Sequence, residues 1–324
     1  MYRVLIIGSG QLGSRHLQAV ASLPFVETID VVDPRSEGLT LGRQRLKEIT
    51  DLQPHIRFNW LARLEDAQLD GDLCVIATQA EGRYALVEKA ATLGYRRFLL
   101  EKIVTQSVAA YDRLLALARD KRLSIWVNCK SRAHPIWKHV KARIEPDESV
   151  LYSSIGGNHG LANNGVHMAD LFVFFTGTTD IGSAGSRIDS VLHATKRGQF
   201  DLSGTLQAST DKGSHFTLSY ASDHVESPVD VVMTRRYRWV VDQMKRQAFE
   251  GVASEGWELR PIPFEGNLSV SHMTKAFASD ILQQGKCELP TLAECYPAHR
   301  FVLTELLPVF NRLLGKNDDQ CPVT

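Results

Sequence analysis

The sequence predicts an α/β protein whose N-terminal part is a doubly wound parallel sheet and whose C-terminal part is an α+β domain with an open, mainly antiparallel sheet. Three observations predict this. An apolar run at the start of the chain breaks into closely spaced glycines, strand-like and helix-like segments then alternate up to Asn128, and strand-like segments follow one another beyond Pro146. Because 324 residues exceed what one core usually supports, we expect two domains, residues 1–130 and 131–324.

The first element is the apolar stretch Val4–Leu12, which ends in a G-x-G-x-x-G pattern and opens into a helical segment, Leu12–Leu23. Backbone N–H groups in such a loop can bind a pyrophosphate, and the glycines let it approach closely. An ordinary strand-to-helix turn is the alternative. The loop residues that we expect to bind a nucleotide cofactor are Gly8, Gly10, Gln11, Leu12 and Gly13.

The second strand, Thr28–Val32, ends at Asp33, which lies 20 residues after Gly13. This spacing completes the dinucleotide fingerprint of a Rossmann domain, in which the acidic residue accepts a hydrogen bond from the ribose 2′-OH. Asp33 therefore favours NAD as the cofactor. Arg35 and Arg43 are close enough in sequence to accommodate NADP, so NADP stays open.

The rest of the first domain alternates regularly. A helical segment extends to Ile49, and the following strands and helices are predicted at Ile56–Asn59, Asp72–Thr78, Glu81–Leu93, Phe98–Leu100, Ala109–Lys121 and Leu123–Asn128. Alternation of this kind implies right-handed crossovers and a parallel sheet, which binds ligands at the carboxyl ends of its strands. We therefore expect Gly10, Asp33, Thr78, Lys102 and Asn128, which each lie just after a strand, to lie at one edge of the sheet, with Thr78 and Glu101 among the residues that bind the cofactor.

Beyond Pro146 the pattern changes to segments that alternate apolar and polar residues, as in a sheet with one covered face. The predicted strands are Val150–Ile155, Ile188–His193, Gly204–Ser209, Phe216–Ala221 and Val229–Val240. The predicted helices are Val166–Phe175, Val270–Gln284 and Leu292–Leu314.

Composition excludes several classes of function. The chain has 37 basic and 37 acidic residues, so we expect no binding to nucleic acid or to an anionic membrane surface. Met1-Tyr2-Arg3 lead directly into the first strand and no apolar run is long enough to span a bilayer, so we expect a soluble protein without a signal peptide. Five scattered cysteines without a C-x-x-C pair indicate a reduced cytoplasmic protein without a disulfide framework or a metal site.

Known hydrolase and nucleotidase motifs are also absent from the sequence: it has no H-E-x-x-H, no G-x-S-x-G and no P-loop. A methyltransferase could share the glycine loop, but it would leave two other candidate residues, Lys102 and His167, without a role.

Two side chains are candidates for chemistry at a reacting carbon. Lys102 could hold a substrate oxygen and stabilise the alkoxide-like charge that develops as hydride moves, although a Glu-Lys pair can also be a solvated turn. Asn163, His167, Asp170 and Phe174 share one face at helical spacing. His167 could act there as a general base together with Asn163. Alternatively, Asn163 or Asn164 caps the helix and His167 only packs.

Polar residues near the same predicted entrance are candidates for binding the substrate. The guanidinium of Arg132 could bind sugar hydroxyls, a carboxylate or a phosphate, or it could form a surface ion pair. The predicted substrate-binding residues are Asn128, Arg132, His159 and Asn164.

The order of these motifs resembles the glucose-fructose oxidoreductase, inositol dehydrogenase and rhizopine catabolism family (Gfo/Idh/MocA). The resemblance covers nearly the whole chain and rests on GSGQLGSRH, DLCVIAT, the Glu-Lys pair, Asn128 with Arg132, and NGVHMADLF. It implies hydride transfer between NAD(P) and a hydroxyl or keto carbon of a sugar, sugar derivative or cyclic polyol. It also implies that Lys102 contacts the reacting oxygen and that His167 acts as acid or base. A homodimer or homotetramer that forms through the C-terminal sheet is implied as well.

The chain departs from this family at two positions. The family usually has Glu-Lys-Pro, whereas Ile103 follows Lys102 here. We therefore expect a trans peptide bond, because a cis bond without proline costs about 3 kcal/mol. Asn163 stands where the family usually has an aspartate, and an amide carries neither a proton nor a charge at neutral pH. This leaves a non-catalytic NAD(P)-binding regulator or sensor as the main alternative, and reduction of a non-sugar ring compound as a further one.

Overall fold

The structure is a computed structural model that describes residues 1–324 except 158–159, 196–198, 225 and 268. The chain divides into two compact units. The first consists of Met1–Thr105, Ala109–Lys130 and Asn267–Ala293, and the second of Gln106–Val108, Ser131–Gly266 and Glu294–Thr324. The segment Asn267–Ala293 lies beyond the predicted boundary at residue 130, yet it packs with the first unit.

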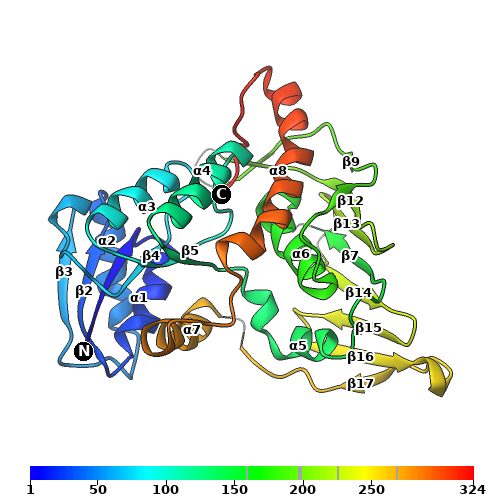
Figure 1. Ribbon diagram of the computed structural model, residues 1–324, viewed down its shortest axis with the longest axis horizontal. Helices are drawn as coiled ribbons and strands as arrows, with labels where there is room; N and C mark the ends of the chain where they lie inside the picture. The colour runs from blue at the N-terminus through cyan, green and yellow to red at the C-terminus, as the bar shows by residue number, and fades with distance from the viewer. Residues whose placement is uncertain (158–159, 196–198, 225, 268) are drawn as a thin grey trace. The chain divides into compact units, whose positions relative to one another are not determined.

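The first unit contains a six-stranded parallel sheet in the order β3-β2-β1-β4-β5-β6 (Figure 1). Its strands are β1 (Tyr2–Ile7), β2 (Val26–Val32), β3 (Arg57–Leu61), β4 (Leu73–Ile76), β5 (Arg97–Leu100) and β6 (Ser124–Val127). The central strands are buried apolar runs because helices cover both faces of the sheet. The predicted doubly wound parallel sheet is confirmed.

Helices surround this sheet as the alternation predicts. They are α1 (Gly13–Ala21), α2 (Ser36–Leu46), α3 (Arg83–Thr92), α4 (Val108–Asp120) and α7 (Val270–Gln284), with a short 3₁₀ turn, η1 (Leu64–Asp66). Helix α7 has the residue range predicted from the sequence and packs beside α1 (Figure 1). It therefore belongs to the same core as the glycine loop.

The second unit contains a nine-stranded, mainly antiparallel sheet in the order β17-β16-β15-β14-β7-β13-β12-β8, with β9 also paired to β12. Only the pair of β7 and β13 is parallel among the described strands of this sheet. Its strands are β7 (Leu151–Gly157), β8 (Gly182–Ser183), β9 (Arg187–Ile188), β12 (Gly204–Ser209), β13 (His215–Ala221), β14 (Val229–Met233), β15 (Tyr237–Asp242), β16 (Gln247–Val252) and β17 (Arg260–Ile262). The predicted open, mainly antiparallel sheet is confirmed.

Two strand predictions in this unit are wrong. The segment predicted as Val229–Val240 is a hairpin of β14 and β15, because the hydroxyl of Thr234 accepts hydrogen bonds from the N–H groups of Arg236 and Tyr237 and forms a turn. The segment predicted as Ile188–His193 forms only the ends of β9 and of β10 (His193–Ala194), which pairs with β11 (Phe200–Asp201).

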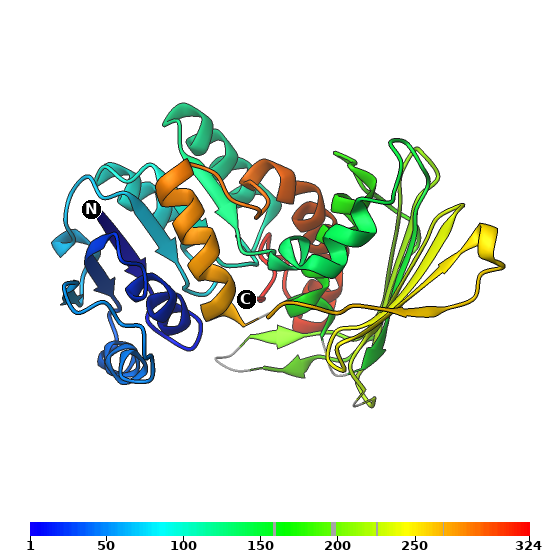
Figure 2. The same ribbon diagram turned by 90° about the horizontal axis from the view of Figure 1, so that it is seen from below.

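Helices cover one face of the second sheet. They are α5 (Pro135–Lys141), α6 (Leu161–Thr176) and α8 (Leu292–Leu314), with 3₁₀ turns η2 (Lys130–Ala133) and η4 (Ala253–Glu255). Phe172 of α6 stacks on Phe216 of β13 with ring centroids 5.4 Å apart. Figure 2 views the sheet nearly edge-on and shows these helices on one side of it. No helix among the described residues is long and apolar enough to cross a membrane.

Helix α6 begins earlier than predicted. Gly160 is its N-cap, so Asn163 and Asn164 lie inside the helix, and the interpretation of either as the cap is wrong. The orphan N–H group of Ala162 is instead satisfied by the carboxylate of Asp201, which comes from β11. His167 is therefore well inside α6 rather than in its first turn.

Asp230, on the covered face of the second sheet, predicts how stability depends on pH. It accepts hydrogen bonds from the hydroxyl of Tyr152 and the amide of Gln243, both at 2.9 Å, and burial raises its pKa to about 6. The folded protein therefore binds its proton more tightly than the unfolded chain does. Between about pH 4 and pH 6, stability should fall as pH rises, by about 3 kcal/mol in total.

The variant Asp230→Asn should lose this part of the pH dependence, and urea unfolding from pH 4 to pH 7 measures it. Asp211→Asn, in an exposed turn, is the matched control. Equal pH dependence in the Asp230→Asn variant and the original protein would contradict the prediction.

Candidate functional site

The glycine loop connects β1 to α1 and is shaped for a close anionic ligand. Gly8 has a φ of +87°, and a Cβ at Gly13 would lie 1.7 Å from the carbonyl oxygen of Gly8. A side chain at Gly13 would therefore clash with the loop backbone, and one at Gly8 would be strained by its left-handed conformation. The first turn of α1 contains no acidic residue, so its N–H groups and the positive end of its dipole can meet a pyrophosphate. The residues present fit a dinucleotide cofactor.

Asp33 lies at the end of β2, where the fingerprint requires it, but its carboxylate makes internal contacts. One oxygen accepts from the N–H of Ser9 at 2.9 Å, and the other accepts from the N–H of Arg35 at 3.0 Å. The Asp33 side chain is only 1% exposed, and the Arg35 guanidinium that pairs with it is 56% exposed. A Cβ at Gly38 would lie 2.2 Å from this carboxylate. Asp33 therefore fixes the glycine loop to the end of β2, and Arg35 covers it.

Removing this carboxylate should weaken cofactor binding. In Asp33→Ala, the N–H of Ser9 loses its charged acceptor, so we expect the Kd for NADH to rise about tenfold or more. Fluorescence titration with NADH measures the change. Asp120→Ala, at an exposed position in α4, should leave the Kd unaltered. An unchanged Kd in Asp33→Ala would show that the loop does not depend on this contact.

Glu101, at the end of β5, connects three elements of the first unit. It accepts from Nε2 of His16 in α1 at 2.8 Å and from the amide of Asn128 at 2.7 Å, while Nδ1 of His16 lies 2.9 Å from the hydroxyl of Thr274 in α7. Burial works to raise the pKa of Glu101. The hydrogen bond and charge of His16 outweigh burial, with help from Asn128, and the pKa falls to about 2. Glu101 is thus an ionised carboxylate held by the helix that follows the glycine loop.

Lys102 follows Glu101 at the same edge of the sheet and is partly exposed. Its peptide bond to Ile103 is cis, so the expected trans bond is wrong. The buried guanidinium of Arg83 donates to the carbonyl oxygens of Glu101, Ile103 and Val104, on both sides of Lys102. The tertiary contacts of Arg83 therefore set the conformation of this loop, which local preference alone does not predict. Burial lowers the pKa of Arg83 to about 10.

Arg83 also donates to the carbonyl oxygen of Thr78, the predicted cofactor-binding residue that follows β4. A Cβ at Gly8 would lie 3.1 Å from atoms of Thr78, so this residue is next to the glycine loop. The carboxyl edge of the parallel sheet thus brings together the glycine loop, Asp33, Thr78, Glu101 and Asn128, as the sequence predicts.

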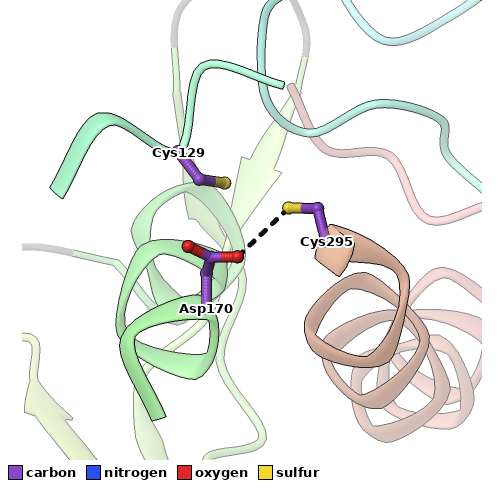
Figure 3. A group of neighbouring side chains, drawn as sticks. All are labelled: Cys129, Asp170 and Cys295. Atoms are coloured by element: carbon purple, nitrogen blue, oxygen red, sulfur yellow. Dashed lines mark hydrogen bonds between the residues drawn. The ribbon is translucent and has the colours of Figure 1, made fainter. Parts of the chain in front are cut away.

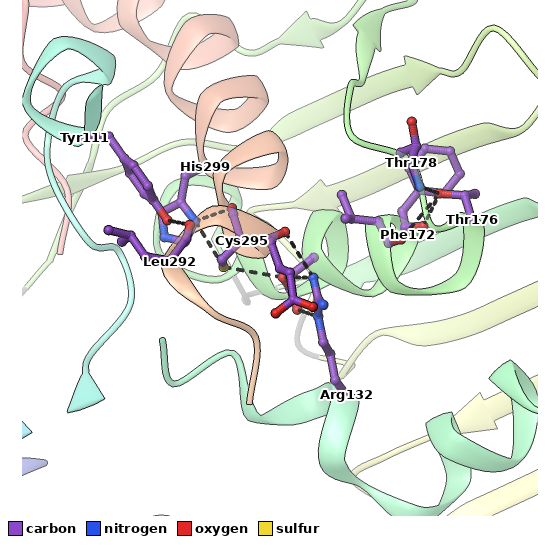
Figure 4. A network of polar contacts seen from close by, with 11 residues as sticks. Tyr111, Arg132, Phe172, Thr176, Thr178, Leu292, Cys295 and His299 are labelled. Atoms are coloured by element: carbon purple, nitrogen blue, oxygen red, sulfur yellow. Dashed lines mark hydrogen bonds and ion pairs between the residues drawn. The ribbon is translucent and has the colours of Figure 1, made fainter. Parts of the chain in front are cut away.

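In the second unit, Arg132 forms a buried bidentate ion pair with Asp170. Both guanidinium–carboxylate distances are 2.6 Å, and neither side chain is more than 9% exposed. The thiol of Cys295 donates to the same carboxylate at 3.3 Å (Figure 3), and Nδ1 of His299 donates to the Cys295 carbonyl at 3.0 Å (Figure 4). Burial acts to raise the pKa of Asp170, and the charge of Arg132 opposes it. Of the two alternatives for Arg132, the structure shows an ion pair, although it is buried.

Asn163 and His167 are one turn apart in α6, and both are partly exposed. The Asn163 amide donates to Asp201 at 2.6 Å, and its oxygen accepts from the N–H of Thr324 at 3.4 Å. Asn164 lies beside them on α6 and is also partly exposed. His159 lies outside the described residues.

Four residues of the site were not predicted from the sequence: His16, Arg83, Asp201 and Thr274. The only sequence signal among them is His16, which lies three residues after Gly13 within the quoted GSGQLGSRH stretch. The contacts of the others come from elements far apart in the chain.

Comparisons with known proteins agree with this geometry. Residues 2–129 match the family model GFO_IDH_MocA, described as an oxidoreductase family with an NAD-binding Rossmann fold. No curated protein sequence matches the chain. The predicted family resemblance is confirmed over residues 2–129 only, and the predicted cofactor class, NAD with NADP possible, is confirmed.

Solved structures share the whole fold at low identity. UDP-N-acetylglucosamine 3-dehydrogenase GnnA from Acidithiobacillus ferrooxidans is 17% identical, with a TM-score of 0.70 over 95% of this chain and 96% of that one. Levoglucosan dehydrogenase in complex with NADH and levoglucosan is 14% identical, with a TM-score of 0.73 over 96% and 98%. Biliverdin reductase from Synechocystis sp. PCC 6803 is 13% identical, with a TM-score of 0.70 over 94% and 97%. These likenesses show the fold, which hosts different substrates.

Proposed function

We propose that this protein, whose residues 2–129 match the GFO_IDH_MocA family of NAD-binding oxidoreductases, transfers hydride between NAD(P) and a hydroxyl or keto carbon of a sugar, sugar derivative or cyclic polyol. One observation carries the proposal. Lys102 follows Glu101 directly, and the Glu101 carboxylate is bound to His16 of the helix that begins at the glycine loop. This contact ties residue 101 to the helix that follows the glycine loop, within one unit, and so supports the proposal that the neighbouring Lys102 donates to a reacting oxygen.

The proposed chemistry divides between two side chains. Bound NAD(P) supplies the hydride acceptor or donor. Lys102 donates a hydrogen bond to the substrate oxygen and stabilises the negative charge that develops there as the C–H bond breaks. His167 takes the hydroxyl proton on a ring nitrogen, or returns it in the reverse direction.

We propose the remaining roles from the contacts that each residue makes. The glycine loop, Asp33, Arg35, Thr78 and Glu101 would form the cofactor site, and Asn164, on the same helix as His167, would contact the substrate. Asn128 donates to Glu101, and Arg132 donates to Asp170. We therefore propose that these two residues hold the carboxylates in place, and that any contact they make with the substrate keeps these hydrogen bonds.

A non-catalytic sensor is the second candidate, because the Asn163 amide cannot carry a proton. The test combines two measurements: titration of NADH and NADPH binding, and NAD(P)H formation or consumption with a panel of sugars, sugar nucleotides and cyclic polyols. We expect turnover of at least one panel compound. Tight cofactor binding with no turnover of any of them would favour the sensor, and turnover of an added non-sugar ring compound alone would favour a reductase of that class.

We also propose that two copies associate through the open face of the second sheet. Leu151 and Met233 are paired across β7 and β14 and are exposed, as is Ile155 on the same face. Sedimentation should show a dimer or tetramer, and Ile155→Asp should shift it towards the monomer. A monomer at all concentrations would contradict this. The five free thiols favour a reducing compartment, which we propose is the cytoplasm.

A further inference from the structure

The carboxylate of Asp201 is built into the start of helix α6. One oxygen accepts from the N–H groups of Ala162 and Leu202, both at 2.8 Å, and the other accepts from the amide of Asn163 at 2.6 Å. Asp201 is only 7% exposed. Burial raises the pKa of Asp201, while the N–H groups of Ala162 and Leu202 and the amide of Asn163 act to lower it and favour the carboxylate. A strand distant in sequence therefore provides the acidic group that caps α6.

The chain leaves room for this carboxylate. Gly160, the N-cap of α6, has a φ of +72°, and a Cβ at this position would lie 1.9 Å from Asp201. An ordinary capping side chain at residue 160 would displace the Asp201 carboxylate. The negative charge at the N-terminus of α6 therefore comes from Asp201 and not from a side chain at residue 160.

The amide of Asn163 has a defined orientation. Its oxygen accepts from the N–H of Thr324, so its NH₂ group faces Asp201. Asn163 precedes His167 by four residues and therefore lies on the same face of α6, one turn away. The other carboxylate on this face, Asp170, is neutralised by its ion pair with Arg132. Asp230, beneath the helix in the sheet, is held by Tyr152 and Gln243.

We propose that Asp201 is a positioning residue, whose carboxylate is the acidic partner of His167 and acts on it through the Asn163 amide. This inference rests on the proposed role of His167 in proton transfer. When His167 takes a proton it becomes an imidazolium, and that cation is stabilised by a buried carboxylate bound to Asn163, one turn away from His167 on α6. The pair of Asp201 and Asn163 thus provides the negative charge that Asn163 alone lacks. Asp201 itself touches neither substrate nor cofactor in this account.

An exchange of the two side chains separates charge from hydrogen bonding. In the double variant Asn163→Asp with Asp201→Asn, the new amide oxygen can accept from Ala162 and Leu202, and its NH₂ group can donate to the new carboxylate. The second oxygen of that carboxylate can accept from Thr324. These four hydrogen bonds are kept, and the charge moves onto α6.

The single variant Asp201→Asn removes the charge. It also leaves two NH₂ groups facing each other, unless the Asn163 amide turns and loses its bond from Thr324. Thermal unfolding reports how much structure each variant keeps.

The deciding measurement is the titration of His167 by NMR in protein labelled with ¹³C-histidine, with His167→Gln to assign its resonance. We expect Asp201→Asn to lower the pKa of His167 by about half a unit or more, and the exchange variant to restore it or raise it further. An unchanged pKa in a folded Asp201→Asn variant would overturn the proposal. If that variant does not fold, a fall in the pKa of the exchange variant would overturn it instead.

Turnover gives a second, separate test with any panel compound that reacts. Asp201→Asn should lower kcat about tenfold with little change in KM, and the exchange variant should recover most of that loss. If no panel compound reacts, the proposed dehydrogenase activity fails, while the His167 titration still decides the role of Asp201.

Discussion

Replacing Lys102 with alanine should lower kcat/KM for hydride transfer about a thousandfold while NAD(P)H still binds. The ammonium group is the only proposed donor to the substrate oxygen, and loss of such a donor costs about two to three orders of magnitude in rate. Cofactor binding should persist, because the glycine loop and Asp33 are untouched and Glu101 keeps its bonds to His16 and Asn128.

Steady-state kinetics with the best panel compound, together with NADH titration, measures both effects. Lys89→Ala is the matched control, since Lys89 is an exposed lysine of α3 in the same unit. A Lys102→Ala variant that keeps the original rate would remove Lys102 from the proposed chemistry.

Replacing Arg132 with methionine should destabilise the second unit by about 3–5 kcal/mol. The substitution leaves Asp170, which is fully buried, without the cation that forms two 2.6 Å hydrogen bonds to it. The thiol of Cys295 is a weak donor and cannot replace a guanidinium.

Urea unfolding measures this loss. Arg300→Met removes an ion pair with Asp180 that is exposed, and it should cost less than about 1 kcal/mol. If Arg132→Met costs no more than Arg300→Met, the buried pair contributes little to stability, and Arg132 would be better explained as a substrate contact.

Most elements of the fold could be predicted because their patterns are local. The parallel strands are short apolar runs between glycines and helices, and α7 and α8 carry clear helical periodicity. The errors occur where the hydrogen bonds of one side chain, which a hydrophobic pattern does not reveal, set the end of an element. The predicted strand Val229–Val240 joins two apolar stretches, and the Thr234 hydroxyl turns the chain between them. The start of α6 depends on Asp201, which lies 39 residues from Ala162.

The candidate site could be predicted only in part for the same reason. The glycine loop and Asp33 form a signature with fixed spacing, so they can be found in the sequence alone. The contacts around Glu101 cannot be found in this way. Glu101 binds His16, which is 85 residues away in the chain, and His16 contacts Thr274, which is a further 258 residues from it. The sequence predicts a trans peptide bond after Lys102, because a cis bond without proline is costly. The structure has this bond cis, next to the carbonyl groups to which Arg83 donates.

If this protein is the proposed dehydrogenase, a sugar-type hydroxyl or keto carbon exchanges hydride with NAD(P) bound to it. To test this, the protein is incubated with oxidised cofactor and each panel compound. The amount of NAD(P)H formed is measured by absorbance, and the change in mass of the compound is measured by mass spectrometry. We expect one compound to lose two hydrogens, about two mass units, in equal amount to the NAD(P)H formed, and the reverse reaction with reduced cofactor to add them back. Bound cofactor that stays unreduced, with no change in mass of any compound in either direction, would contradict it.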